Sequence, residues 1–88
     1  MSWACELTSS AAKDLRRLPP ADLKRIAHAI DELEQDPMSG DVRPLHGPEW
    51  HGCYRKLIGS FRLIFTLESE AKRVIVLSVL RPSESTYK

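Results

Sequence analysis

Arginines and a tyrosine interrupt or follow the aliphatic runs in the last third of the chain. Arg55 and Arg62 stand among apolar residues, and Arg81 and Tyr87 come after the last apolar run. Arginine keeps its positive charge and presents a planar fork of donors that matches phosphate oxygens. Several arginines on one surface would hold a phosphodiester and stabilise the extra charge of its pentavalent transition state. These residue types therefore favour a phosphate-bearing ligand.

RNA fits such a site because it supplies its own nucleophile, the 2′-hydroxyl. No clustered metal-ligand spacing occurs in the sequence, so no metal and no cofactor are predicted. A tyrosine near the arginines can stack on a base or assist proton transfer. His46 and His51, in the segment before the strands, could act as acid or base. The alternative is that the arginines are simply solvated on an open sheet face.

The elements that must position these arginines begin with a hairpin. Gly59-Ser60 predicts a two-residue turn between strands Cys53–Ile58 and Phe61–Glu68. Pairing across this turn places Arg55 and Arg62 on one face. The other face is predicted to face the core and to carry these residues: Phe61, Leu63, Phe65, Leu67, Tyr54, Lys56 and Ile58.

Two helices are predicted before the hairpin. Thr8, Ser9 and Ser10 offer N-cap hydroxyls to a short helix over 11–17, and Pro20 suits the first turn of a longer helix that ends near Asp36. The remaining elements are a first strand over 3–8, a loop over 38–52 and a last strand over 73–80. The sequence thus predicts an α+β fold of order β-α-α-β-β-β, in which a helical hairpin packs on one face of an antiparallel sheet.

The chain of 88 residues is predicted to be a single domain over 1–88. It has no apolar run long enough for a transmembrane helix and no evident signal peptide, so no membrane partner and a cytoplasmic location are predicted. Residues 1–50 hold six Lys and Arg against nine Asp and Glu, whereas residues 51–88 hold seven against three. The strand-rich half is therefore electropositive and attracts anions.

Cys5 and Cys53 are far apart and lack metal-ligand spacing. In a cytosolic protein we expect them to be reduced and to pack as small apolar residues. A catalytic thiol at Cys53 beside His51 is the alternative.

Nearly the whole chain resembles the RelE/ParE superfamily of toxins from type II toxin–antitoxin systems. The segments that carry the resemblance are Ala11-Ala12-Lys13-Asp14-Leu15, Leu18-Pro19, Pro44-Leu45-His46-Gly47, Tyr54-Arg55, Gly59-Ser60-Phe61-Arg62-Leu63-Ile64-Phe65, and Val76-Leu77-Ser78-Val79 followed by Arg81 and Tyr87.

Similarity to the RelE branch implies a toxin that cleaves messenger RNA on the ribosome and thereby inhibits translation. It also implies neutralisation by a cognate antitoxin, and operator DNA as a partner of the toxin–antitoxin complex only. By this resemblance Arg62 would hold the scissile phosphate, and Arg55 would add charge stabilisation. Arg81 would stabilise charge or protonate the leaving group, and Tyr87 would stack on the base or assist proton transfer. Lys56, Tyr54 and His51 are predicted to contact RNA.

The pattern departs from that branch at two places. Lys56-Leu57 stands where an apolar residue followed by a basic one is usual, so Lys56 would need a β-bulge to reach the open face. Without a bulge, Lys56 would face the core. The segment around Arg81 also lacks the usual Gly-His-Arg-like form. Two alternatives therefore stay open: a ParE-like inhibitor of DNA gyrase, and a degenerate member that only binds its antitoxin and, as a complex, operator DNA.

Overall fold

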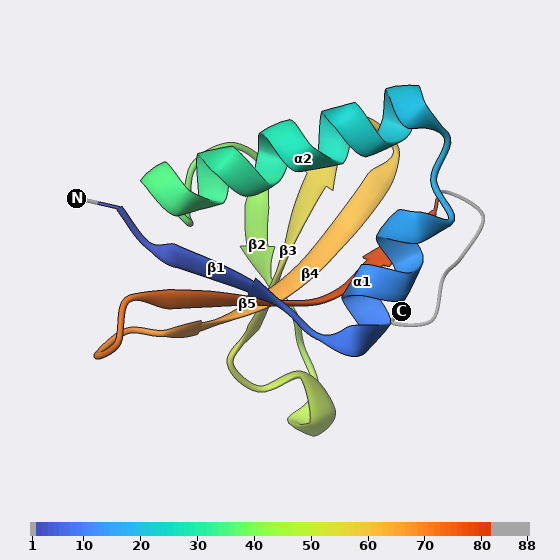
Figure 1. Cartoon of the computed structure of the whole chain (residues 1–88). Coiled ribbons are helices and arrows are strands. Elements are labelled where there is room, and N and C mark those ends of the chain that lie inside the picture. The colour runs from blue at the N-terminus through green and yellow to red at the C-terminus, as the bar shows by residue number, and fades with distance from the viewer. Residues whose placement is uncertain (1, 82–88) are drawn as a thin grey trace.

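A five-stranded sheet forms the centre of the molecule, with the strand order β1-β5-β4-β3-β2 (Figure 1). The computed structural model describes residues 2–81. Its strands are β1 (Ala4–Leu7), β2 (Val42–Pro44), β3 (Cys53–Ile58), β4 (Phe61–Glu68) and β5 (Arg73–Leu80). Neighbouring strands are antiparallel except for β1 and β5, which are parallel.

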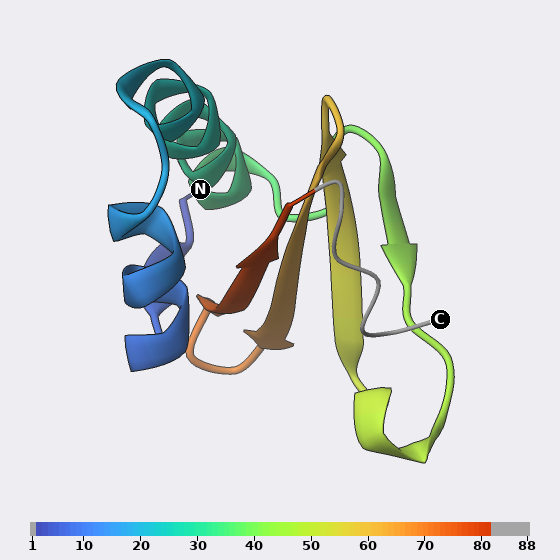
Figure 2. The same cartoon turned by 90° about the vertical axis from the view of Figure 1, so that its right-hand side faces the viewer.

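Two helices, α1 (Ser9–Arg16) and α2 (Pro20–Gln35), lie on one face of this sheet (Figure 2). Thr8 caps α1, since its Oγ1 accepts a hydrogen bond from the Ala11 N–H at 3.1 Å. Pro20 opens α2, as its fixed φ allows. The predicted α+β fold, with a helical hairpin on one face of the sheet, is confirmed.

The core lies between the helices and the sheet. It is formed by fully buried side chains from both layers, among them Ile26, Leu33, Leu63, Phe65, Val74 and Val76. Leu23, expected in the apolar stripe of α2, is instead 40% exposed. The buried stripe of α2 runs through Ile26, Ala29 and Leu33.

Two features of the sheet were not predicted. Val42–Pro44 lies within the predicted loop but pairs with β3, whose outer edge would otherwise be unpaired. A short 3₁₀ helix, η1 (Pro48–Trp50), follows it. The parallel pairing of β1 with β5 also corrects the expectation of a purely antiparallel sheet. The helical hairpin carries the chain from β1 at one edge of the sheet to β2 at the other edge, and β5 later returns beside β1 in the same direction.

The β3–β4 hairpin has the predicted register. Ile58 lies opposite Phe61, and Arg55 lies opposite Ile64. Gly59 has φ of +60°, a left-handed conformation that favours glycine at this turn position. The prediction of which β3 and β4 side chains share a face is therefore confirmed.

An irregularity interrupts the pairing of β4 with β5. Ile64 pairs with Ser78 and Phe65 with Val76, so Leu77 is an extra residue. Its carbonyl accepts a hydrogen bond from Thr8 Oγ1 at 3.0 Å, and Asp14 Oδ2 accepts one from the Val79 N–H at 2.9 Å. Side chains at the start of α1 and within it thus satisfy the backbone groups that the bulge frees.

Candidate functional site

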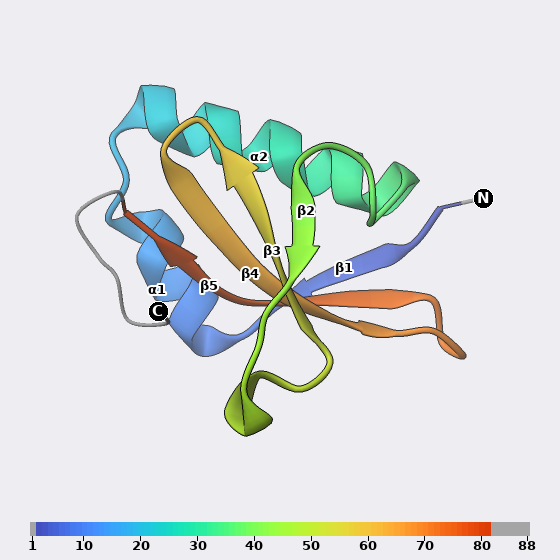
Figure 3. The ribbon, with the colours of Figure 1, turned by 180° about the vertical axis from the view of Figure 1, so that it is seen from behind.

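The face of the sheet opposite α1 and α2 carries no α-helix among residues 2–81 and is called the uncovered face in that sense (Figures 2 and 3). Arg62 lies on this face, opposite Leu57 on β3 and Leu80 on β5. Arg55 lies on the same face, two positions along β3 from Leu57. The prediction that Arg55 and Arg62 share the uncovered face is confirmed by this register.

A third arginine on this face, Arg43, was not predicted from the sequence. It lies on β2 directly opposite Arg55, and the side chains of opposed residues project to the same face. Figure 3 views the sheet from this side, with β2 and β3 in front of the helices. The signal in the sequence was the Val42-Arg43 alternation, which is too short to indicate a strand by itself. Arginines from three adjacent strands therefore share this face.

Asp41 is the acidic residue that pairs with two of these arginines. Its Oδ1 lies 3.8 Å from Arg43 Nε and 3.8 Å from Arg55 Nη1. These distances allow electrostatic attraction but exceed those of hydrogen bonds. The Arg55 side chain is only 19% exposed, and its Nη1 is buried without a hydrogen-bond partner in the described part of the chain. A buried cationic donor of this kind favours an anion that can come closer than Asp41 does.

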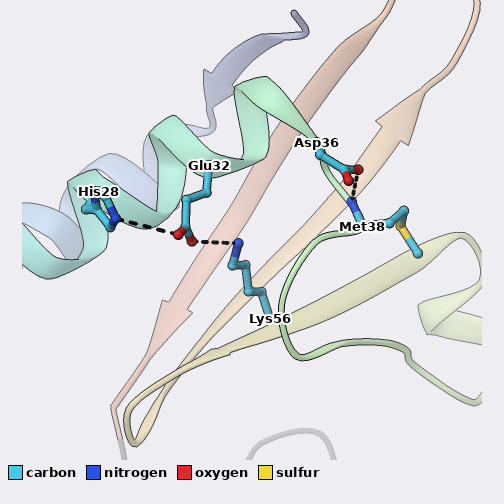
Figure 4. A network of polar contacts seen from close by, with 5 residues as sticks. All are labelled: His28, Glu32, Asp36, Met38 and Lys56. Atoms are coloured by element: carbon cyan, nitrogen blue, oxygen red, sulfur yellow. Dashed lines mark hydrogen bonds and ion pairs between the residues drawn. The ribbon is translucent and has the colours of Figure 1, made fainter.

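Lys56, predicted to contact RNA, lies on the opposite face. No register shift occurs between β3 and β4, so the bulge that would have turned Lys56 outward is not present there. The Lys56 side chain is 3% exposed, and its Nζ forms an ion pair with Glu32 Oε1 of α2 at 3.1 Å (Figure 4). The Lys56 ammonium group beside it lowers the pKa of Glu32 below its usual value. Lys56 is therefore left out of the candidate RNA surface.

Tyr54 lies on the face opposite to the three arginines, and His51 lies outside the strands that carry them. Tyr54 alternates onto the helix-covered face and stacks on Phe65, with ring centroids 5.7 Å apart. His51 is exposed and follows η1 in the segment that leads to β3. Tyr54 therefore packs in the layer between the sheet and the helices, and His51 lies beside the start of β3.

Arg81 reaches toward α1. Its Nη2 donates a hydrogen bond to the carbonyl oxygen of Arg17, just after α1, at 3.1 Å. Leu80, the residue before it, pairs with Arg62, so Arg81 begins on the opposite side of β5. In the described structure Arg81 thus contacts the segment that follows α1. Tyr87 lies outside the described residues.

The remaining candidate groups are the cysteines. Burial, reinforced by Glu34 and Glu6, raises the pKa of the Cys5 thiol to about 11, so this thiol stays protonated and unreactive near neutral pH. Within residues 2–81, no three His, Cys, Asp or Glu side chains gather closely enough to hold a metal ion. No helix of that range is long and apolar enough to span a membrane.

Comparison with known proteins gives consistent matches over almost the full length. A family model described as the ParE toxin of type II toxin–antitoxin system, parDE, matches residues 5–85. The chain is 30% identical to the putative toxin RelE1 of Methanocaldococcus jannaschii, with 100% of the chain and 98% of that relative covered. It is 29% identical to toxin RelG of Mycobacterium tuberculosis, with 90% of each covered.

Solved structures show the same fold. The toxin–antitoxin complex RelBE2 of Mycobacterium tuberculosis matches with a TM-score of 0.83 at 24% identity, covering 92% of this chain and 99% of that one. The archaeal RelE–RelB complex of Pyrococcus horikoshii matches with a TM-score of 0.78 at 25% identity, covering 97% and 100%.

Proposed function

Since the chain belongs to the ParE toxin family of type II toxin–antitoxin systems, within the RelE/ParE superfamily, we propose that it is a ribosome-dependent mRNA endoribonuclease. It inhibits translation by cutting messenger RNA during its decoding. The observation that carries this proposal is the row of Arg43, Arg55 and Arg62 on the uncovered face.

The reaction proposed for this face is cleavage of a phosphodiester by the 2′-hydroxyl of the RNA itself. The 2′-oxygen attacks phosphorus, the bond to the 5′-oxygen breaks, and the products carry a 2′,3′-cyclic phosphate and a 5′-hydroxyl. Arg62 binds the scissile phosphate, and Arg55 stabilises the negative charge that grows in the transition state. Attack by the 2′-hydroxyl needs no metal and no cofactor.

Proton transfer is assigned to Arg81 and Tyr87 by family resemblance. Arg81 must leave the Arg17 carbonyl to act near Arg62, because the two guanidinium groups start on opposite sides of the sheet. In this proposal Arg81 stabilises or protonates the leaving 5′-oxygen, and Tyr87 stacks on the base or assists proton transfer.

A cognate antitoxin is the proposed protein partner. Support comes from the related structures, which include the RelBE2 complex of Mycobacterium tuberculosis and the RelE–RelB complex of Pyrococcus horikoshii. Operator DNA is proposed as a partner of the toxin–antitoxin complex only, and no membrane partner is proposed.

Arg62→Ala tests the nuclease directly. Induction of the wild-type protein in a bacterium should stop protein synthesis promptly and create new mRNA 5′ ends that carry hydroxyl groups. Arg62→Ala should abolish both effects and keep the fold, because its side chain lies on the uncovered face. Arg16→Ala, an exposed arginine of α1 on the other side of the sheet, is the matched control and should behave as wild type. Full toxicity of Arg62→Ala would refute the phosphate role.

Inhibition of DNA gyrase is the second candidate, favoured by the burial of Lys56. A lysine paired with Glu32 on the helix-covered face cannot serve as a catalytic cation on the uncovered face. Intact mRNA together with an SOS response and arrested DNA synthesis would select this candidate. The same induction experiment therefore separates the two.

A further inference from the structure

Asp41, Arg43 and Arg55 form a small group in which one carboxylate oxygen faces two guanidinium groups. Asp41 Oδ1 is 3.8 Å from a nitrogen of each arginine. A carboxylate that forms a permanent ion pair with an arginine is expected at hydrogen-bond distance, about 2.8 Å. The Asp41 side chain is 51% exposed, so water and other solutes reach it.

The backbone holds Asp41 at this distance. Its carbonyl oxygen accepts a hydrogen bond from the Leu57 N–H at 3.0 Å, which ties the residue to β3 beside Arg55. The residue before it, Gly40, has φ of +79°, and a Cβ built there would lie 3.5 Å from Lys56 Cε. The segment thus passes over the Lys56 stem, and Lys56 is in turn held by Glu32 (Figure 4).

The position of this group suits a neighbouring phosphate of the same RNA strand. Arg55 and Arg62 are diagonal neighbours on adjacent strands, which separates their Cα atoms by about 7–8 Å. Successive phosphates of an extended single strand are separated by a similar distance, and Arg43 lies on the far side of Arg55. One phosphate can therefore lie at Arg62 while the next lies between Arg55 and Arg43.

We propose that Arg43 and Arg55 form a second phosphate subsite, and that Asp41 is an internal carboxylate which the incoming RNA phosphate displaces. This inference rests on the proposed function, because it takes RNA as the ligand of the uncovered face. A phosphate has more acceptor oxygens than Asp41 offers and is not tethered to β3, so it can satisfy the buried Nη1 of Arg55. In the absence of RNA, the negative charge of Asp41 reduces the repulsion between Arg43 and Arg55, which lie opposite each other on adjacent strands.

Asp41→Asn tests the displacement because it removes the charge and keeps the shape. The probe is a fluorescein-labelled 2′-O-methyl RNA of about eight nucleotides, which cannot be cleaved by 2′-hydroxyl attack. Anisotropy titration should show that Asp41→Asn binds about three- to fivefold more tightly than wild type, as expected for loss of one partly exposed competing charge. Glu70→Gln, an exposed carboxylate on the β4–β5 turn, removes the same charge elsewhere and should change affinity less than twofold.

A double-variant cycle separates the subsite from a general charge effect. In an Arg55→Ala background, the gain from Asp41→Asn should shrink to less than twofold, because the carboxylate then competes only for the exposed Arg43. Unchanged or weaker binding by Asp41→Asn, or an equal gain from Glu70→Gln, would overturn the inference.

A second probe distinguishes this inference from the proposed function. Inorganic pyrophosphate, followed by the shift in the unfolding temperature, reports anion binding without RNA. An Asp41→Asn gain with pyrophosphate in a protein that leaves cellular mRNA intact would refute the nuclease and keep the subsite. If Arg62→Ala abolishes RNA binding but Asp41→Asn leaves the affinity unchanged, the second subsite is refuted, whereas RNA binding by the uncovered face is supported. Failure of all variants to bind either probe would refute the subsite.

Discussion

Arg55 and Lys56 are adjacent on β3, yet the alternation of the strand gives them opposite surroundings. Arg55 faces the uncovered side, and the carboxylate that pairs with it, Asp41, lies 3.8 Å from its buried Nη1. Lys56 faces the helices and has a carboxylate within 3.1 Å. A cation that has a carboxylate at 3.1 Å is already neutralised, whereas one whose paired carboxylate lies at 3.8 Å can still bind an anion that comes closer. This difference assigns Arg55 to the candidate site and Lys56 to the packing of α2 on the sheet.

Replacing Lys56 by Met tests that assignment at the residue scale. Methionine keeps the buried stem and removes the charge, so we expect stability to be unchanged or raised by about 1–2 kcal/mol. Glu32→Ala should instead lower the free energy of unfolding by about 1–3 kcal/mol, because it leaves the Lys56 charge buried and unpaired. Urea unfolding measures both. The Lys56→Met variant should remain toxic. Loss of toxicity in a variant that is still stably folded would show that Lys56 takes part in the functional site.

At the scale of elements, the Glu32–Lys56 pair links α2 to β3, and His28 lies 3.5 Å from the same carboxylate (Figure 4). Because folding lowers the pKa of Glu32, the unfolded chain binds a proton first as the pH falls. The stabilisation is thus fully present above the unfolded pKa near 4.5 and is lost as the pH falls through the lower folded value.

We therefore expect the stability difference between wild type and Glu32→Gln to be constant near neutral pH and to shrink below about pH 4.5. Urea unfolding at a series of pH values between neutral and acidic measures it. In a Lys56→Met background, the Glu32→Gln substitution should show no such loss on acidification. An undiminished difference in strong acid would contradict the pairing.

The bulge in β5 depends on α1 in a similar way. Asp14→Ala would leave the Val79 N–H without its acceptor, which should cost about 1–3 kcal/mol of unfolding free energy despite the better helix propensity of alanine. Asp14→Asn keeps a side-chain oxygen acceptor and should cost less. Thermal or urea unfolding of the two variants measures this, and equal losses would show that charge rather than the hydrogen bond matters.

For the molecule as a whole, local signals predicted much of the fold and part of the site. The Gly59-Ser60 turn was enough to set the β3–β4 register, and with it the shared face of Arg55 and Arg62. What could not be predicted depends on partners distant in sequence. The three-residue β2 exists because β3 has a free edge, and the β5 bulge is satisfied from α1. Arg43 was missed for that reason, since its face is defined only once β2 is a strand.

The charge distribution gives the last prediction. Basic residues occur on both layers, but the uncovered face presents arginines from three adjacent strands and the helices present theirs on the other side. If RNA binds the uncovered face, each arginine there that contacts a phosphate releases counterions on binding. Arg43→Ala and Arg62→Ala should then each reduce the slope of log affinity against log salt concentration by about 0.7, whereas Arg16→Ala should leave it unchanged. Anisotropy titrations of the non-cleavable RNA at several salt concentrations measure these slopes. An equal reduction by Arg16→Ala would mean that RNA contacts the molecule without regard to face, because only diffuse attraction to net charge treats the two sides alike.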